Sequence, residues 1–129
     1  MSTEEIHSIP RSLNPILHPG EYVFCTVSDF QSIPFDQILF IFKEEEGYTI
    51  VLPRQIANNL RLEYTYMAAW ITLGIITSLD IVGLTARFST ALANGGISCN
   101  VVAAYHHDHI FVEYKDGNKA LTLLEEVVI

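Results

Sequence analysis

Three histidines and one aspartate stand side by side in the segment His106-His107-Asp108-His109. Imidazole nitrogens and carboxylate oxygens are ligands for zinc, iron or nickel, so this segment is a candidate metal site. The spacing argues against a metal, because a tight turn directs successive side chains apart and the sequence offers no identifiable distant ligand. We therefore expect a polar hairpin tip without a metal. The alternatives are a metal site and a contact that responds to pH, since histidine titrates near neutrality.

A second candidate site is the polar loop of residues 77–83, which joins an apolar segment to an expected helix. A helix start presents backbone N–H groups, and these favour an anionic group such as a carboxylate. Asp80 could meet an ammonium group at the same place, and Gly83 permits the close approach of a ligand or of another backbone. The polar residues Ser98 and Asn100 follow on the next expected strand. Donors, acceptors and one charge together are what recognition of a zwitterion requires.

The same residues also have a purely structural interpretation. The side chain of Ser78 or Asp80 would then cap the helix, and Asn100 would satisfy buried backbone groups. The sequence leaves both interpretations open.

Motifs of covalent and phosphoryl-transfer enzymes are missing from the sequence. It has no nucleophile elbow, phosphate-binding loop, HExxH or CxxC motif, and its glycines do not form a dinucleotide-binding fingerprint. The two cysteines, Cys25 and Cys99, lie in apolar runs typical of buried thiols and make neither a disulfide framework nor a zinc site. We expect no catalytic residues and no cofactor.

The composition restricts the partners of the chain. Its 129 residues include seven Lys and Arg against fifteen Asp and Glu, a formal charge of -8. This excess repels nucleic-acid phosphates and anionic membranes, so we expect neither as a partner. The most apolar window, residues 66–84, contains Asp80 and two glycines, and is expected to fold as a strand, a loop and a helix start. Without a signal peptide at the N-terminus, a cytoplasmic location is expected.

The first half of the chain predicts three strands and one helix. The first 20 residues contain three prolines and are expected to be an irregular leader. The β-branched and aromatic residues of 21–27 predict a strand, followed by a loop over residues 28–37. Two apolar runs, 38–43 and 48–52, flank a Glu-Glu-Glu-Gly turn and predict a hairpin. A short helix is expected from Pro53 to residue 60.

The second half predicts the order strand, helix, strand, strand, helix. A buried strand is expected over residues 68–76, and a helix from Leu84 to the Gly-Gly pair at 95 and 96. Strands are expected at 97–105 and 110–114, with the histidine segment 106–109 as the turn between them. A closing helix carries Ala120, Leu121, Leu124 and Val127, and residues 127–129 could add a last strand.

This order of elements is typical of an α+β, ferredoxin-like (βαββαβ) topology, with helices on one face of an antiparallel sheet. The first half follows the same plan, with its first helix replaced by the loop 28–37. We therefore expect two abbreviated copies, residues 1–63 and residues 64–129. About 60 residues are few for an independent core, so the copies should share a sheet or a core.

At these residues the sequence resembles the ACT domain family. The span of residues 78–114, SLDIVGLTARFSTALANGGISCNVVAAYHHDHIFVEY, resembles the first helix and central hairpin of an ACT domain, and DIVGLTARFSTALANGGIS within it is similar to the ACT repeats of aspartate kinases. The stretch LNPILHPGEYVFCTV, residues 13–27, and the acidic hairpin after it resemble small stand-alone proteins with paired ACT-like domains.

The resemblance implies regulatory binding of an amino acid or a similar small molecule, commonly at an interface between paired ACT domains. By resemblance, the ligand contacts fall on the strand-to-helix loop and on the facing strand. They are Ser78, Leu79, Asp80, Val82, Gly83 and Leu84 in the loop, and Ile97, Ser98, Asn100 and Val101 on the strand.

The function expected from these observations is a non-catalytic, allosteric regulatory module. ACT domains usually regulate an enzyme fused to them, and this chain has no room for one, so the regulated protein should be a separate, unidentified partner. A homodimer is expected, because ferredoxin-like sheets leave edges and a face that need covering. The alternatives are a ligand-free dimerisation module and, third, a metal-binding protein that uses residues 106–109.

Overall fold

The computed structural model of the chain describes residues 11–75 and 82–128. The described strands form one antiparallel sheet of seven strands in the order β3-β4-β2-β5-β7-β6, with β1 paired to β5. The strands are β1 (Pro15–Leu17), β2 (Tyr22–Val27), β3 (Phe40–Lys43), β4 (Tyr48–Pro53), β5 (Met67–Leu73), β6 (Cys99–Ala103) and β7 (Asp108–Glu113). The helices are α2 (Arg54–Asn59), α3 (Leu84–Asn94) and α4 (Gly117–Glu125), with short 3-10 turns η1 (Phe35–Gln37) and η2 (Tyr114–Asp116).

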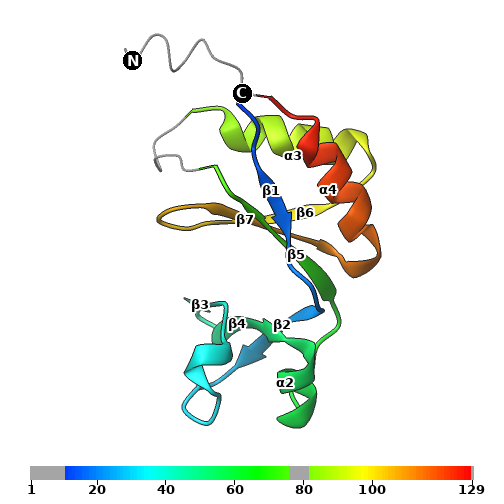
Figure 1. The fold of residues 1–129 in the computed structure, drawn as a ribbon. Coiled ribbons are helices and arrows are strands. Elements are labelled where there is room, and N and C mark those ends of the chain that lie inside the picture. The colour runs from blue at the N-terminus through cyan, green and yellow to red at the C-terminus, as the bar shows by residue number, and fades with distance from the viewer. Residues whose placement is uncertain (1–10, 76–81, 129) are drawn as a thin grey trace.

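Strand β5 joins the two halves of the molecule (Figure 1). Residues 67 and 68 pair with β2, residues 68–72 pair with β7, and residues 71–73 pair with β1. The orders β3-β4-β2-β5 and β6-β7-β5-β1 each form a four-stranded ferredoxin-like sheet. The chain is therefore an α+β protein of two abbreviated ferredoxin-like copies. The predicted sharing of a sheet is confirmed, with β5 common to both copies.

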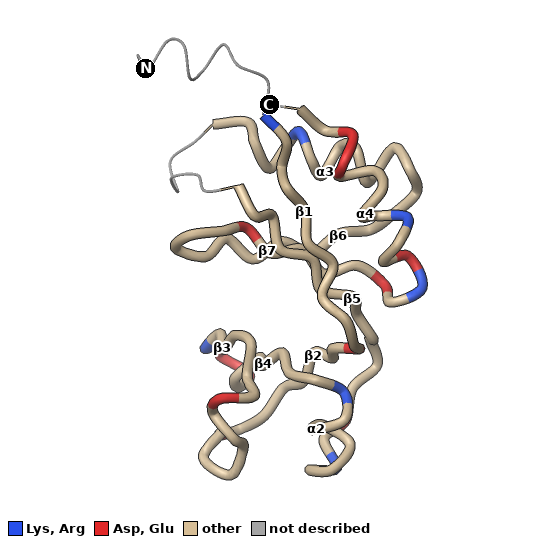
Figure 2. Tube along the Cα trace, in the orientation of Figure 1, with Lys and Arg blue, Asp and Glu red and all other residues tan. Residues whose placement is uncertain are grey.

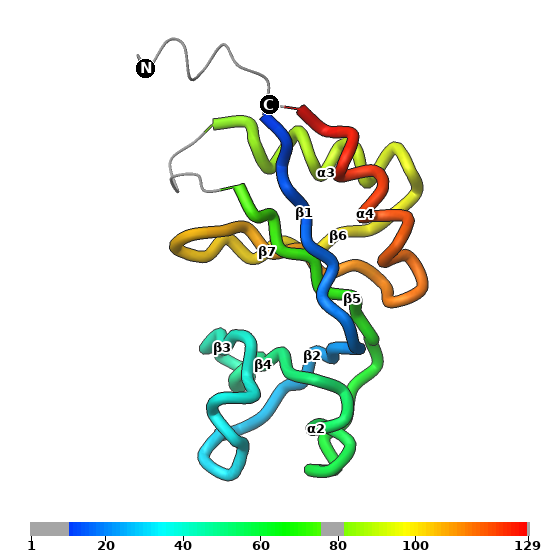
Figure 3. The backbone as a smooth tube through the Cα atoms, viewed as in Figure 1, coloured from blue at the N-terminus to red at the C-terminus, as the bar shows by residue number. Residues whose placement is uncertain are grey.

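Each half packs its helices on one face of the sheet (Figure 3). Side chains alternate along β5 because successive residues of a strand point to opposite faces. Ala69, Ile71 and Leu73 pack with α3 and α4, where Phe88 and Leu124 complete the core. In the other half, α2 and the loop before η1 cover β2 and β4 through a separate cluster around Ile50.

No described helix covers the opposite face of the sheet, which we call the helix-free face. A third hydrophobic cluster lies on this face. Ala68 and Trp70 of β5 point into it, and Phe111 of β7 is its largest fully buried side chain. The ring of Phe24 on β2 meets Phe111 edge-on at 5.4 Å, and Phe40 on β3 lies 6.4 Å from it. The helix-free faces of the two halves therefore pack against each other, and this contact fixes their relative position.

The irregular leader expected over the first 20 residues is wrong at residues 15–17, and its first ten residues lie outside the described part of the chain. Residues 15–17 form β1 beside β5, and Leu13 is fully buried in the core under α3 and α4. Pro15 is compatible with a strand here because β1 lies at the edge of the sheet, where a missing N–H leaves no ladder bond unmade. Before β1, Ser12 forms an isolated antiparallel bridge with Val128. Of the last strand that the sequence analysis considered for residues 127–129, the described residues show this bridge alone.

The turn expected over residues 106–109 is shorter in the structure, which is a second correction. Asp108 and His109 belong to β7, whose register pairs His109 with Thr72 of β5 and with Val102 of β6. Of the strand expected at 110–114, residues 110–112 are the buried centre of β7 and Tyr114 lies in η2. The polar first residues of β7 did not indicate a strand.

The hairpin predicted in the first half is confirmed as β3 and β4. Its turn closes with the Glu44 N–H donating to the Gly47 carbonyl at 2.8 Å. Gly47 has a φ of 146°, and a Cβ there would lie 2.8 Å from the carbonyl oxygen of Val27, so both conformation and space require glycine.

The basic residues are dispersed along the trace instead of forming a stripe (Figure 2). No helix in the described part of the chain is long and apolar enough to cross a membrane.

Candidate functional site

The loop site predicted from the sequence lies at the start of α3. Gly83 is the N-cap, in the left-handed conformation with a φ of 91°, and makes no side-chain cap bond. The first turn closes with the Arg87 N–H donating to the Gly83 carbonyl at 3.1 Å. Val82 is 96% exposed, and a Cβ on Gly83 would meet no described atom within 4 Å. Gly83 is thus required here by its backbone conformation and not by a shortage of space.

Three of the predicted contact residues lie in the core that holds α3 on the sheet. Leu84 and Ile97 are 7% and 3% exposed, and Val101 packs beside them. The Ile97 N–H donates to the Leu92 carbonyl at 2.9 Å, which ends α3 through Gly96. The side chains of Leu84, Ile97 and Val101 therefore fix the position of α3 against β6.

The two polar residues predicted on the facing strand lie apart from the start of α3. Ser98 is exposed before β6, and Asn100 lies on β6 with its amide N–H donating to the Phe111 carbonyl at 3.4 Å. Because Val101 faces α3, Asn100 points to the helix-free face. Within one chain, the structure does not bring Asn100 and the start of α3 together. Ser78, Leu79 and Asp80 lie outside the described residues, so neither their capping role nor their ligand contacts are described.

Asn100 lies beside a buried phenol. The hydroxyl of Tyr66 is buried and has no hydrogen-bond partner within the described residues. Burial raises the pKa of Tyr66, Glu113 adds to the rise, and the nearby Asn100 amide partly offsets it without forming a well-shaped hydrogen bond.

A histidine cluster on the helix-free face connects β5, β7 and the loop after β1. His18 stacks on the indole of Trp70, with ring centroids 3.6 Å apart. Its Nε2 lies 2.7 Å from Oγ1 of Thr72, and that hydroxyl lies 3.0 Å from Nδ1 of His109. Trp70 donates its indole N–H to the same Nδ1 at 3.1 Å. No sequence pattern predicts this cluster, because the residues of its three contacting pairs are 54, 39 and 37 positions apart in the sequence.

The donors around His109 define its protonation state. An indole N–H can only donate, so Nδ1 of His109 must accept and carry no proton. His109 is then neutral, with its proton on Nε2. Burial lowers the pKa of His109, and the neighbouring His107 and His18 lower it further. Burial also lowers the pKa of His18. The pH-sensitive contact considered from the sequence therefore has a geometric basis at His109.

The remaining histidines of residues 106–109 do not converge. Nδ1 of His107 lies 3.3 Å from the Ile75 carbonyl, and the rings of His107 and His109 are 6.5 Å apart at 84°. Among the residues that the structure describes, no group of three or more His, Cys, Asp or Glu side chains is placed to hold a metal ion. Both cysteines are free, and burial raises the pKa of each thiol.

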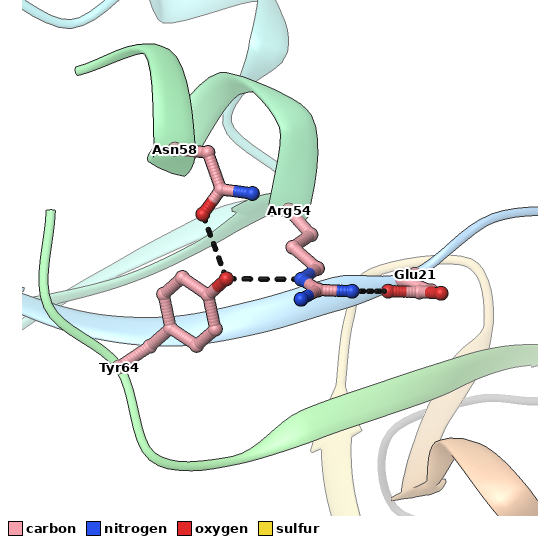
Figure 4. Close-up of polar contacts among 4 residues, drawn as sticks. All are labelled: Glu21, Arg54, Asn58 and Tyr64. Carbon is pink, nitrogen blue, oxygen red and sulfur yellow. Dashed lines mark hydrogen bonds and ion pairs between the residues drawn. The ribbon is translucent and has the colours of Figure 1, made fainter. Parts of the chain in front are cut away.

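A cavity of about 430 Å³ opens where β2, α2 and η2 meet. Arg54 is fixed at its rim by a network of four side chains (Figure 4). Its Nε–H donates to the Tyr64 hydroxyl at 2.9 Å, which donates in turn to Oδ1 of Asn58 at 2.7 Å. Its Nη1 donates to Oε2 of Glu21 at 2.6 Å. The lining residues are Gly20, Glu21, Tyr22, Pro53, Arg54, Gln55, Asn58 and Tyr114.

A smaller cavity of about 100 Å³ lies between the halves on the helix-free face. Phe40, Trp70 and Phe111 form its aromatic walls, and among its described lining residues His109 alone is ionisable. The sequence analysis identified neither cavity, because each is built from residues of both halves.

Comparison with known proteins places the chain in a family. Residues 3–69 match the ACT domain family, and residues 67–126 match it a second time. The chain is 44% identical to a protein of unknown function from Vibrio cholerae, VC0802, described as a possible transport protein, over 90% of this chain and 89% of that one, with a TM-score of 0.82. A comparison with curated proteins finds no match.

More distant structures share the fold. The regulatory subunit of aspartate kinase from Thermus thermophilus is 10% identical, covers 85% of this chain and 92% of its own, and has a TM-score of 0.64. A putative C-terminal regulatory domain of aspartate kinase from Porphyromonas gingivalis is 18% identical, covers 90% and 94%, and has a TM-score of 0.57. With two matched domains in tandem, the chain belongs to the ACT domain family.

Proposed function

We propose that this protein is a non-catalytic regulatory module that binds an amino acid or a similar small molecule and acts on a separate protein. Residues 1–63 and 64–129 would be its two regulatory halves. The observation that carries the proposal is the start of α3, where Gly83, an N-cap residue in the left-handed conformation, precedes the first turn of an eleven-residue helix. The membership of the chain in the ACT domain family supports the regulatory assignment.

The binding mode follows from the groups at this end of the helix. Backbone N–H groups near residues 82–84 would hold the ligand carboxylate, because they carry the positive end of the helix dipole. Asp80 would hold the ammonium group. Asn100 would orient the ligand, and since it points to the other face of its own sheet, it would do so from a second copy of the chain. The proposed ligand site therefore lies between two protomers of a homodimer.

The regulatory step is thermodynamic linkage. A ligand held between two surfaces favours the arrangement in which both contact it, by as much as its affinities for the two arrangements differ. Strand β5 belongs to both ACT copies, so a change at the end of β5 next to α3 is connected through one continuous strand to β2. The partner protein would read that change.

A thermal-melt panel tests the proposal. The protein is melted with each of the twenty amino acids, common nucleotides and divalent metals. A ligand at about 100 times its dissociation constant adds roughly 2.7 kcal/mol and should raise the melting temperature by several degrees. A shift with a small organic molecule that is lost in Gly83→Leu supports the proposal, and a shift with metals alone contradicts it.

A ligand-free dimerisation module is the second candidate, and the exposed edge of the sheet favours it. Phe42 on the edge strand β3 is 64% exposed, and Phe35 in the preceding turn η1 is 72% exposed. Exposed apolar side chains at an edge strand are typical of a pairing surface. A dimeric mass in solution together with a silent ligand panel would support this candidate over the first.

A further inference from the structure

The cavity of about 430 Å³ at the junction of the two halves is built from elements far apart in the sequence. Gly20 and Glu21 come from the loop that carries the chain from β1 to β2, and Arg54 and Asn58 come from α2. Tyr114 comes from η2 in the other half. The volume of the cavity lies in the range of small-molecule sites, about 300–1,000 Å³.

Arg54 is held in place before any ligand arrives. Exposed arginines usually lose side-chain entropy when they bind a ligand. Here the Tyr64 hydroxyl accepts from Nε, Glu21 accepts from Nη1, and the Arg54 backbone N–H also donates to the Glu21 carbonyl at 2.9 Å. The phenol of Tyr64 is itself oriented by Asn58 (Figure 4). The guanidinium is therefore preorganised.

This network leaves hydrogen-bonding groups unused. Among the described residues, Nη2 of Arg54, Oε1 of Glu21 and the side-chain nitrogen of Asn58 make no hydrogen bond. The cationic donor of Arg54 and the anionic acceptor of Glu21 thus lie side by side at the same cavity. Tyr22 and Tyr114 also line this cavity.

We propose that this cavity binds a free amino acid as a zwitterion, with its carboxylate on Nη2 of Arg54 and its ammonium group on Glu21. A ligand with only a carboxylate would face the Glu21 charge, and a ligand with only an ammonium group would face the Arg54 charge. A zwitterion satisfies both, because each of its charges meets the opposite charge. The Tyr22 and Tyr114 rings offer an apolar surface for the amino-acid side chain.

This site goes beyond the proposed function, because it uses no residue of the loop before α3 and is complete within one chain. It joins Tyr114 of one half to Glu21 and Arg54 of the other, so its occupant connects the two ACT copies directly. It also has a built-in reporter. Trp70 is the one tryptophan in the sequence, and its ring lies edge-on to Tyr22 at 5.4 Å.

The experiment is a titration of the full chain with each of the twenty amino acids, followed by Trp70 fluorescence and calorimetry. For an amino acid that binds, its amide and its N-acetyl derivative are titrated as well. We expect both derivatives to lose about tenfold or more in affinity, since each lacks one of the two charges. Equal affinity for either derivative contradicts a zwitterion site.

Four variants locate the site. Arg54→Gln and Glu21→Gln should each weaken binding about tenfold or more, and Glu21→Gln retains an oxygen that can accept from Arg54, so it is the variant that preserves the fold. Arg61→Gln and Glu63→Gln are matched controls, because both side chains are exposed and neither forms an ion pair among the described residues. We expect unchanged affinity in both controls.

The outcomes separate this site from the one at α3. Affinity lost in Arg54→Gln and Glu21→Gln but kept in Gly83→Leu supports the cavity. Affinity kept in both cavity variants overturns the inference, and its loss in Gly83→Leu would leave the proposed function standing. If no amino acid binds the wild-type chain, the inference is wrong, while the proposed function still depends on the other small molecules of the melt panel.

Discussion

The indole N–H of Trp70 donates to Nδ1 of His109 over 3.1 Å and so connects β5 to β7 on the helix-free face. A protonated His109 would place two N–H donors against each other at this contact, and the Thr72 hydroxyl, 3.0 Å from the same nitrogen, would have to accept from it. The pairing of β5 with β7, beside the cavity that also contacts β3, is thereby coupled to the charge of one imidazole.

We expect the protein to become less stable as the pH falls from 7.5 to 5.5. The pKa of His109 lies below its ordinary value of 6.5 in the folded chain, chiefly through burial, so the unfolded chain binds more protons between the two values. Its contribution to stability is fully present above about pH 6.5 and is lost as the pH falls toward the folded pKa. His18 acts in the same direction. Melting temperatures across this range measure the effect.

The variant His109→Asn tests the source of this pH dependence. Asparagine places an uncharged acceptor near the position of Nδ1, so the contact with Trp70 can persist while the titrating group is gone. We expect a flatter profile than in the wild type, with His106→Asn, in the exposed turn, as the control. Of the groups near His109, His107 and His18 lower its pKa and Asp108 raises it. An unchanged slope in His109→Asn would assign the pH dependence elsewhere.

Leu13→Ala should destabilise the protein strongly although it precedes the first strand. Leu13 is fully buried in the core under α3 and α4, and truncating a buried leucine costs about 2–5 kcal/mol. Ile16→Ala, three residues on at a position 46% exposed, is the matched control and should cost far less. Urea denaturation of both variants measures the difference. Equal effects would mean that the N-terminal segment does not pack as described.

Phe111→Ala should weaken both halves together. The ring is 1% exposed and packs against Phe24 and Phe40 of the other half, so its removal should cost about 3–5 kcal/mol. Because β5 is common to both copies, we expect a single transition in which Trp70 fluorescence and far-ultraviolet circular dichroism coincide. Two separated transitions in the wild type would contradict the shared core.

Gly47→Ala should destabilise the acidic hairpin by about 1–3 kcal/mol, because the new Cβ would lie 2.8 Å from the Val27 carbonyl oxygen at a φ of 146°. Gly20→Ala is the control. Gly20 also has a positive φ, 103°, but the nearest atom to its Cβ would be the Tyr22 hydroxyl at 3.6 Å. A similar loss in both variants would show that conformation alone, and not the close approach to Val27, sets the requirement at Gly47.

Local sequence patterns predicted most elements of this fold. The helix from Leu84 to the glycines at 95 and 96 and the hairpin around Gly47 carry their own periodicity and turn residues, so one segment suffices to predict each. Strand β1 carries no such signal. Its three residues are a strand because β5 offers them an edge and because Leu13 before them enters a distant core.

The site was predicted less completely, for a related reason. Gly83 lies at the N-cap of α3, where the loop pattern placed it. Asn100 was expected beside it, but the register of β6 turns its side chain to the helix-free face. The Arg54 network and the histidine cluster depend on contacts between distant strands, and no spacing in the sequence encodes them.

The measurement that tests the central claim most directly compares two glycines at opposite ends of α3. Gly83 and Gly96 both have positive φ values, 91° and 78°, and a Cβ on either would meet no described atom within 4 Å. Leucine at each should therefore strain the backbone similarly, by about 1–3 kcal/mol. Calorimetric titration with the ligand from the melt panel should show binding lost in Gly83→Leu and retained in Gly96→Leu. Full affinity in Gly83→Leu would contradict a ligand site at the start of α3.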